Sequence, residues 1–266
     1  LAGFLTPTSG TARICGADVV EDSLTVRRHL GYLPEGAPLY GDMTVEAFLH
    51  FIAAVRGLDG AMRREAISRA VERTQLGPVL HQPIDTLSKG YKRRVGLAQA
   101  ILHDPPVLIL DEPTDGLDPN QKYEVRRLIR EMAGEKAIII STHILEEVDA
   151  VCTRAVLIAR GRVVADSHPD ALRRLSPLHN AVRIRLPASE AARIQEPLRG
   201  VRGVREVQAA RLVDGMTEML VLPEPGSEIA SEILAQLRSA GVAARELVVE
   251  RGRLDDVFRQ LTLEQS

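Results

Sequence analysis

The chain has 266 residues, enough for one large domain or for a large domain joined to a smaller one. Its formal net charge of −2 argues against a nucleic-acid binder held by bulk electrostatics. No apolar run approaches the roughly 20 residues that a membrane helix needs, and the first residues do not resemble a secretion signal. We therefore expect a cytoplasmic protein whose membrane contacts, if it has them, go through a partner.

Strands and helices are predicted to alternate through the first two thirds of the chain. Two short strands around a glycine turn are expected within 8–20, then a strand at 29–33, and strands at 154–159 and 163–165 close the region. Helices are expected from Thr44 onward, over about 61–75, from Ser88 to about 103, over about 120–133 and over 144–150. Apolar runs at 107–110 and 137–140 predict strands buried on both faces of a parallel sheet. The alternation predicts an α/β domain.

The pattern changes near Pro177. Predicted strands at 182–186, 203–209, 217–222 and 243–249 are interleaved with helices at 188–198, 227–240 and 254–263. The order βαββαβ predicts a small α+β domain with a ferredoxin-like split fold. We therefore expect a first domain over 1–176 and an accessory domain over 181–266.

The segment VLILDEPTDGLD at 107–118 carries the strongest chemical signal. A buried strand would deliver Asp111 and Glu112 to the sheet edge where α/β folds bind ligands. One carboxylate could hold Mg²⁺ and its neighbour could polarise a water that attacks a phosphoryl group. A bare Asp-Glu pair could equally be the acidic start of a helix, but the full segment favours the chemical interpretation.

His143 follows the second buried strand, 32 residues after Asp111. At that place a histidine could contact a γ-phosphate and orient the attacking water. Alone, a histidine after a strand is more often a hydrogen-bonded loop residue. The functional interpretation depends on the parallel placement of this strand end beside the one that carries Asp111 and Glu112.

A third signal is the segment LSKGY at 87–91, which opens a predicted helix. A helix N-terminus offers free N–H groups to phosphate, Ser88 adds a hydroxyl, and Gly90 allows close approach to the backbone. Further positive charge comes from Lys89, Lys92, Arg93 and Arg94. Taken alone, the segment is better explained as a capped helix with a solvated basic face.

Together these segments resemble the ATP-binding-cassette (ABC) ATPase family. On that resemblance LSKGY (87–91) is similar to the signature motif, Asp111 to the Walker B Mg²⁺ ligand and Glu112 to the catalytic glutamate. GLDP (116–119) resembles the D-loop, with Asp118 at the dimer seam, His143 resembles the switch histidine, and GYLPE (31–35) resembles the Q-loop. The helices over about 44–104 resemble the helical subdomain.

The resemblance implies a P-loop-type ABC ATPase domain and the ATP-hydrolysing subunit of a transporter, an exporter similar to drug-export and gliding-motility cassettes. It implies ATP and Mg²⁺ as cofactors, a transmembrane permease and a second ATP-binding subunit in a head-to-tail dimer as partners, no nucleic acid, and a place on the inner face of the cell membrane. The implied roles are catalysis by Glu112 and His143, metal binding by Asp111 and Glu35, and nucleotide binding by Ser88, Lys89, Gly90, Tyr91 and Asp118. A soluble non-transport ABC ATPase or a regulatory cassette remains the alternative.

The sequence departs from the family pattern in three places. Glu35 stands where the family usually has Gln, and Lys89 and Tyr91 replace a Gly and a Gln of the signature motif. No GxxxxGK[ST] phosphate loop (Walker A) occurs, and LAGFLTPTSG (1–10) resembles the segment that follows such a loop. We therefore expect an N-terminally truncated cassette whose loop and first strand lie upstream of Leu1. Such a chain would neither bind nor hydrolyse ATP appreciably, although its full-length parent would be active, and it would expose apolar side chains of its sheet.

Overall fold

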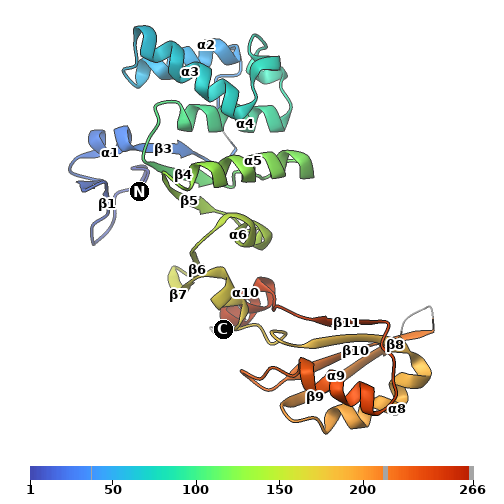
Figure 1. Ribbon diagram of the computed structural model, residues 1–266. Coiled ribbons are helices and arrows are strands. Elements are labelled where there is room, and N and C mark those ends of the chain that lie inside the picture. The colour runs from blue at the N-terminus through green and yellow to red at the C-terminus, as the bar shows by residue number, and fades with distance from the viewer. Residues whose placement is uncertain (37, 212–214, 264–266) are drawn as a thin grey trace. The chain divides into compact units, whose positions relative to one another are not determined.

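A computed structural model describes residues 1–36, 38–211 and 215–263 (Figure 1). The chain forms two compact units, Leu1–Val151 and Cys152–Ser266. The border predicted between 176 and 181 is not tested by this division and stays a prediction. Among the described residues, no helix has the length and apolar character needed to cross a membrane.

The first unit contains three parallel strands surrounded by helices. Its elements are β1 Arg13–Ile14, β2 Ala17–Asp18, α1 Ser23–His29, β3 Leu30–Leu33, α2 Val45–Val55, α3 Gly60–Thr74, α4 Lys89–Ile101, β4 Val107–Asp111, α5 Pro119–Met132, β5 Ala137–Ser141 and α6 Leu145–Val151. Single 3₁₀ turns at Gly77–Val79 and Ile84–Thr86 connect α3 to α4. The α/β alternation is confirmed, although α1 was not predicted.

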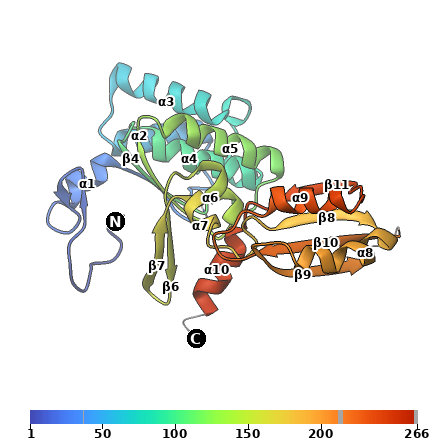
Figure 2. The ribbon, with the colours of Figure 1, turned by 60° about the horizontal axis from the view of Figure 1, so that its bottom comes forward.

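The sheet of the first unit has the order β3-β4-β5, and its strands are in register at their ends. Leu33 pairs with Leu110, and Asp111 pairs with Ser141. One face of the sheet packs on a single aliphatic core to which α2, α3, α4 and α5 all contribute. These helices lie together in Figures 1 and 2, with α2 and α3 stacked above α4 in Figure 1. The other face carries a smaller cluster built from β1, β2 and α1.

The expectation that both strands are buried on both faces is only partly correct. In β4, Leu108 and Leu110 are fully buried and the alternate side chains are half-buried. In β5, Ile139 is 47% exposed, so the prediction for 137–140 is wrong at this position. The reason is that the cluster on this face of the sheet, built from β1, β2 and α1, packs against β3 and β4 and includes no described residue of β5.

Gly31 sets the distance between α4 and the sheet. A Cβ at this position would collide with the carbonyl oxygen of Ala100 in α4 and would lie 2.6 Å from Cδ2 of Leu108. A residue without a side chain therefore allows the C-terminal half of α4 to rest directly on β3.

The second unit contains a hairpin, a short helix and a split βαββαβ fold. Its elements are β6 Ala155–Ala159, β7 Arg162–Ser167, α7 Pro169–Arg173, β8 Val182–Pro187, α8 Ala188–Arg199, β9 Val204–Arg211, β10 Met216–Pro223, α9 Ala230–Ser239, β11 Glu246–Val249 and α10 Leu254–Leu263. The four-stranded sheet has the order β11-β8-β10-β9, and all its pairs are antiparallel (Figure 2). This topology confirms the ferredoxin-like prediction.

One face of this sheet forms the core of the second unit. Along β8, buried and half-buried residues alternate, and Ile184 is fully buried. Met219 of β10, Ile194 of α8 and Ile233 of α9 are also fully inaccessible. The period of two in the strand and the amphipathic helices therefore close a complete apolar core.

Candidate functional site

Three loops leave the C-terminal edge of the parallel sheet side by side. Glu35 lies two residues after β3, Asp111 ends β4 and Glu112 follows it directly, and His143 lies two residues after β5. Because the three strands are parallel and in register, these residues emerge at the same edge. This is the edge at which open α/β sheets bind their ligands.

Glu112 and His143 form the closest functional pair. The imidazole Nδ1 of His143 lies 2.7 Å from the carboxylate Oε1 of Glu112, and the backbone N–H of His143 donates to the same oxygen at 3.1 Å. The hydrogen bond and the charge of Glu112 raise the pKa of His143. The glutamate carboxylate is mostly buried, whereas the imidazole is exposed. The sequence prediction that these two strand ends meet is therefore confirmed geometrically.

The second carboxylate oxygen of Glu112, Oε2, is a buried hydrogen-bond acceptor at this edge. Oε2 is buried and has no hydrogen-bond partner among the described residues, and the same holds for the hydroxyl of Thr114. Buried polar atoms without partners are rare in folded proteins and cost stability. Because Oε2 has almost no accessible surface, a water could reach it only after neighbouring groups move, and Oε2 could then accept the hydrogen bond that a general base requires.

Asp111 is supported by a neighbouring hydroxyl. Ser141 Oγ donates to Asp111 Oδ1 across the β4–β5 pair. Among the described residues there is no group of three or more His, Cys, Asp or Glu side chains able to cage a metal. The oxygen donors of Asp111 and Ser141 nevertheless fit Mg²⁺, which takes one or two carboxylates and fills its other positions with water and phosphate.

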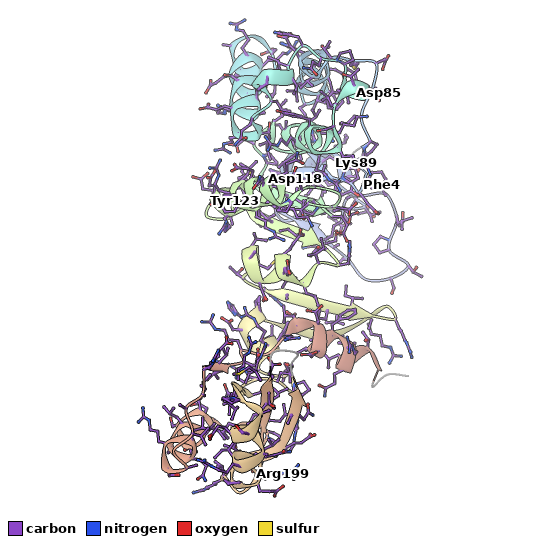
Figure 3. All side chains as sticks on the ribbon, turned by 90° about the vertical axis from the view of Figure 1, so that its right-hand side faces the viewer. Phe4, Asp85, Lys89, Asp118, Tyr123 and Arg199 are labelled. Carbon is purple, nitrogen blue, oxygen red and sulfur yellow. The ribbon has the colours of Figure 1, made fainter. Side chains whose placement is uncertain are left out.

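The N-terminus of α4 lies against the loop that follows Glu112. Ser88 is the N-cap, and its hydroxyl accepts from the N–H of Tyr91 at 3.4 Å. The Lys89 side chain passes close to Gly116, since a Cβ there would lie 3.7 Å from Lys89 Cδ. Figure 3 shows Lys89 and Asp118 in the same region of the molecule. The signature-like and D-loop-like segments of one chain therefore touch.

Gly90 is covered by a side chain from α5. A Cβ at Gly90 would overlap the amide of Gln121, so Gln121 rests on the glycine backbone. Sequence analysis expected Gly90 to be open to a phosphate. A phosphate could reach its backbone only after the flexible amide of Gln121 swings away.

The solvated basic face that was expected from the sequence does not include Arg93. Its side chain is buried, and it donates to the carbonyl oxygens of Pro34 and Glu112. The correction has a physical cause, because position 93 shares a helix face with Leu97 and Ala100, both buried in the core. That spacing was the signal available in the sequence.

Three predicted site residues have roles that the structure leaves as predictions. Asp118 is the N-cap of α5 and accepts from the N–H of Gln121 at 3.0 Å. Tyr91 lies under the guanidinium of Arg94, 5.6 Å from the ring centroid. Glu35 is exposed.

A buried ion pair near the site was missed by sequence reasoning. Glu147 of α6 is 2% exposed and lies 3.7 Å from the guanidinium of Arg126 in α5. The pair joins the helix that follows His143 to the helix that follows Asp118. The sequence gives no sign of it, since both residues look like ordinary charged positions of amphipathic helices.

A parallel sheet with an Asp-Glu strand end, a paired histidine and a helix N-terminus at one edge is the arrangement of an ATP-binding cassette. Comparison with known proteins agrees. The family model described as "ABC transporter" matches residues 1–115. A solved structure titled "Structure of ATP binding subunit of ABC transporter" is 32% identical, with a TM-score of 0.59, covering 65% of this chain and 72% of that one.

Two curated relatives extend the comparison. The "Probable multidrug ABC transporter ATP-binding protein YbhF" of Escherichia coli is 39% identical over 65% of this chain and 30% of its own length. The "Daunorubicin resistance ATP-binding protein DrrA3" of Streptomyces coeruleorubidus is 29% identical over 98% of this chain and 81% of its own length. The chain belongs to the ABC transporter family of ATP-binding proteins. It spans 30% to 57% of the length of several relatives that it matches.

Proposed function

We propose that this chain is most of the ATP-binding and ATP-hydrolysing subunit of an ABC exporter that powers a separate membrane permease, and that ATP hydrolysis requires a phosphate loop in addition to these residues. The observation that carries the proposal is the pair of Glu112 and His143, 2.7 Å apart at the sheet edge that also carries Asp111. The export direction rests on relatives whose names refer to multidrug transport, Nod factor export and daunorubicin resistance.

In this proposal Glu112 is the general base. Its buried, unpartnered Oε2 would accept a proton from the attacking water, while Oε1 stays bonded to His143. The raised pKa of His143 lets its imidazole carry a positive charge beside the carboxylate and close to the site of a γ-phosphate. Asp111 and Glu35 would hold Mg²⁺, which neutralises phosphate charge when bound.

The helix N-terminus at α4 would serve the nucleotide of a second subunit. In a head-to-tail pair, Ser88, Lys89, Gly90 and Tyr91 would face the phosphates bound by the partner, and Asp118 would lie at the seam. Free N–H groups and the helix dipole favour an anion at this place. Gln121 would have to leave Gly90 as the partner's phosphate arrives.

An exposed aromatic surface on the helical region supports the permease as partner. Tyr40, Phe51 and Val55 are 56%, 41% and 67% exposed, and the rings of Tyr40 and Phe51 meet edge to face at 5.6 Å. Clustered exposed apolar side chains are typical of protein-binding sites. This contact would place the protein on the inner face of the membrane. Co-purification with ribosomes or DNA in place of a permease would favour the soluble alternative.

ATP affinity is the first test. The sequence contains no GxxxxGK[ST] loop, whose N–H groups and lysine supply several charge-assisted contacts to phosphate. We therefore expect residues 1–266 alone to bind ATP weaker than micromolar in a calorimetric titration. A chain in which a phosphate loop precedes these residues should bind in the micromolar range.

The decisive test is Glu112→Gln in that longer chain. We expect a loss of ATP turnover of roughly 100-fold or more with ATP still bound, because the amide cannot take the proton of water. Glu135→Gln is the matched control, since Glu135 is exposed and precedes β5 at its opposite end. Equal turnover of Glu112→Gln and the unaltered protein would overturn the proposed function.

A further inference from the structure

Arg93 has an environment unlike that of the other cations around it. Its side chain is 6% exposed, whereas Lys92 and Arg94 on either side are half-exposed. Burying a charge costs several kcal/mol unless it is paired and hydrogen-bonded. The buried guanidinium therefore needs an explanation that a solvated basic face does not give.

The contacts of Arg93 join two functional loops. Nη1 donates to the carbonyl oxygen of Pro34 at 3.2 Å, and Nη2 donates to the carbonyl oxygen of Glu112 at 2.5 Å. Pro34 precedes Glu35 in the loop after β3, and Glu112 directly follows β4. One planar guanidinium on α4 thus holds the backbone of both loops, which the single ammonium of a lysine could not do in the same geometry.

Nearby carboxylates partly offset the cost of burying this cation. Burial is the largest effect and lowers the pKa of Arg93 from its ordinary value, while the charges of four carboxylates act in the opposite direction. These carboxylates are Asp115, Asp111, Glu112 and Glu35. Three of these carboxylates belong to the predicted metal and catalytic residues, and the fourth is that of Asp115. The charge of Arg93 lowers their mutual repulsion, while its hydrogen bonds go to backbone carbonyl oxygens and not to the carboxylates.

The backbone that Arg93 holds is unusual. Glu112 has a φ of +46°, in the left-handed region that costs a non-glycine residue free energy. The backbone N–H of Glu112 donates to the carbonyl oxygen of Ser141 at 3.0 Å, and the carbonyl oxygen of Glu112 accepts from Nη2 of Arg93. Both ends of this strained peptide are therefore fixed, one by β5 and the other by α4.

We propose that Arg93 is a positioning residue that ties the catalytic carboxylate of Glu112 to the helix that begins at Ser88. This inference rests on the proposed function. Ser88 and Gly90 open the same rigid helix, so the first turn and Arg93 move as one body. A shift of α4 when its N-terminus meets a phosphate is transmitted through Arg93 to the carbonyl of Glu112, and hence to the Glu112–His143 pair. Phosphate contact on one side of the helix is thereby linked to alignment of the base on the other.

The test measures the Glu112–His143 pair without nucleotide, on the 266-residue chain. The probe is the solvent exchange rate of the His143 backbone N–H, followed by NMR, because this group donates to Glu112 Oε1. In Arg93→Met we expect this exchange to be roughly tenfold faster, the loss of one moderate hydrogen bond. Arg93→Lys, which keeps the charge without the fork, should lie between.

Arg94→Met is the matched control. Arg94 is the adjacent arginine, donates to Gln75 Oε1 at 3.0 Å and stacks on Tyr91, away from Glu112. We expect this variant to leave His143 exchange unchanged. A purely structural role of Arg93 would accelerate the amides of Leu108 and Leu110 in the same proportion as that of His143. That result, or unchanged His143 exchange in Arg93→Met and Arg93→Lys, would overturn the proposal.

The outcome is separable from the proposed function. A local effect at His143 with normal ATP turnover in Glu112→Gln would keep the positioning contact and remove the catalytic assignment. Where the phosphate-loop-containing chain hydrolyses ATP, Arg93→Lys should lower kcat with little change in KM, since the side-chain hydrogen bonds of Arg93 among the described residues go to the carbonyl oxygens of Pro34 and Glu112 and not to Ser88, Lys89, Gly90 or Tyr91. A raised KM with unchanged kcat would contradict the positioning role.

Discussion

The cores of the two units are built from the same types of aliphatic residue, but the units differ in where their unpaired polar groups lie. In Leu1–Val151, the functional edge holds buried oxygens of Glu112 and Thr114 that have no hydrogen-bond partner among the described residues, and Glu112 has a positive φ. In Cys152–Ser266, the ferredoxin-like sheet closes its core around fully buried side chains such as Ile184, and its buried oxygen without a described hydrogen-bond partner, Oε2 of Glu190, lies on α8 and not at a strand end. Both units therefore contain unsatisfied groups, but only in unit 1 do they gather with backbone strain at the edge that carries the proposed chemistry.

The largest effect is expected in the core of unit 2. Ile184→Ala should lower the free energy of unfolding of that unit by about 2–5 kcal/mol, because the side chain is fully buried and its removal leaves a cavity. Urea unfolding followed by hydrogen exchange in each unit would measure it. If the amides of β4 lose as much protection as those of β8, the two units do not unfold separately.

Acid should destabilise unit 1 through His103. Burial and the nearby Arg56 lower its pKa to about 4, and its Nε2 contacts the carbonyl oxygen of Leu30 at 3.2 Å. Below pH 6.5 the unfolded chain takes up a proton that the folded chain refuses, so stability is lost as the pH falls from 6.5 to 4. The loss should be on the order of 1–3 kcal/mol. Denaturant midpoints across this range should vary less in His103→Gln, and an equal slope in both proteins would contradict the assignment.

Helix capping gives an intermediate effect that compares two helices of unit 1. The hydroxyl of Thr44 accepts from the N–H of Ala47 at 3.2 Å, so Thr44→Ala should cost about 1 kcal/mol. Asp59 caps α3 without a side-chain hydrogen bond, and Asp59→Ala should change stability by less than about 0.5 kcal/mol. Chemical denaturation of the two variants measures the difference, and equal costs would show that the Thr44 bond contributes nothing.

The smallest effect should come from the exposed strand position. Ile139→Thr should alter the stability of unit 1 by less than about 0.5 kcal/mol, because nearly half of this side chain already lies in water. The comparison with Ile184→Ala tests whether the same residue type is a core residue in one unit and a surface residue in the other. A loss above about 2 kcal/mol would mean that Ile139 is covered in solution.

Much of this architecture could be predicted from the sequence. The strand ends at Asp111 and His143 were recognisable because apolar runs stop abruptly at polar residues, and the N-caps Thr44 and Ser88 are confirmed by their hydrogen bonds. The βαββαβ order was recognisable from the strand periodicity. These features depend on local sequence alone.

The remaining features depend on how one element is rotated against another. In the sequence, Arg93 is one of three consecutive basic residues, and the packing of α4 on the sheet places its side chain in the interior. Gln121 reads as an ordinary residue of a first helical turn, and the approach of α5 to α4 brings it onto Gly90. The spacing of Arg93 from Leu97 and Ala100 along α4 could indicate that it faces the core, but no pattern within the segment could identify its partners, which lie far away along the chain.

The missing side chain at Gly31 governs how far α4 stands from the catalytic edge. A single methyl group there would meet the Ala100 carbonyl and push the helix outward. Since Arg93 lies on this helix and bonds to Glu112 at 2.5 Å, an outward step of more than about 1 Å would lengthen that bond beyond the normal range of N–H···O hydrogen bonds. The absence of a Cβ at Gly31 therefore sets the distance that the buried guanidinium of Arg93 must span to reach the carbonyl oxygen of Glu112.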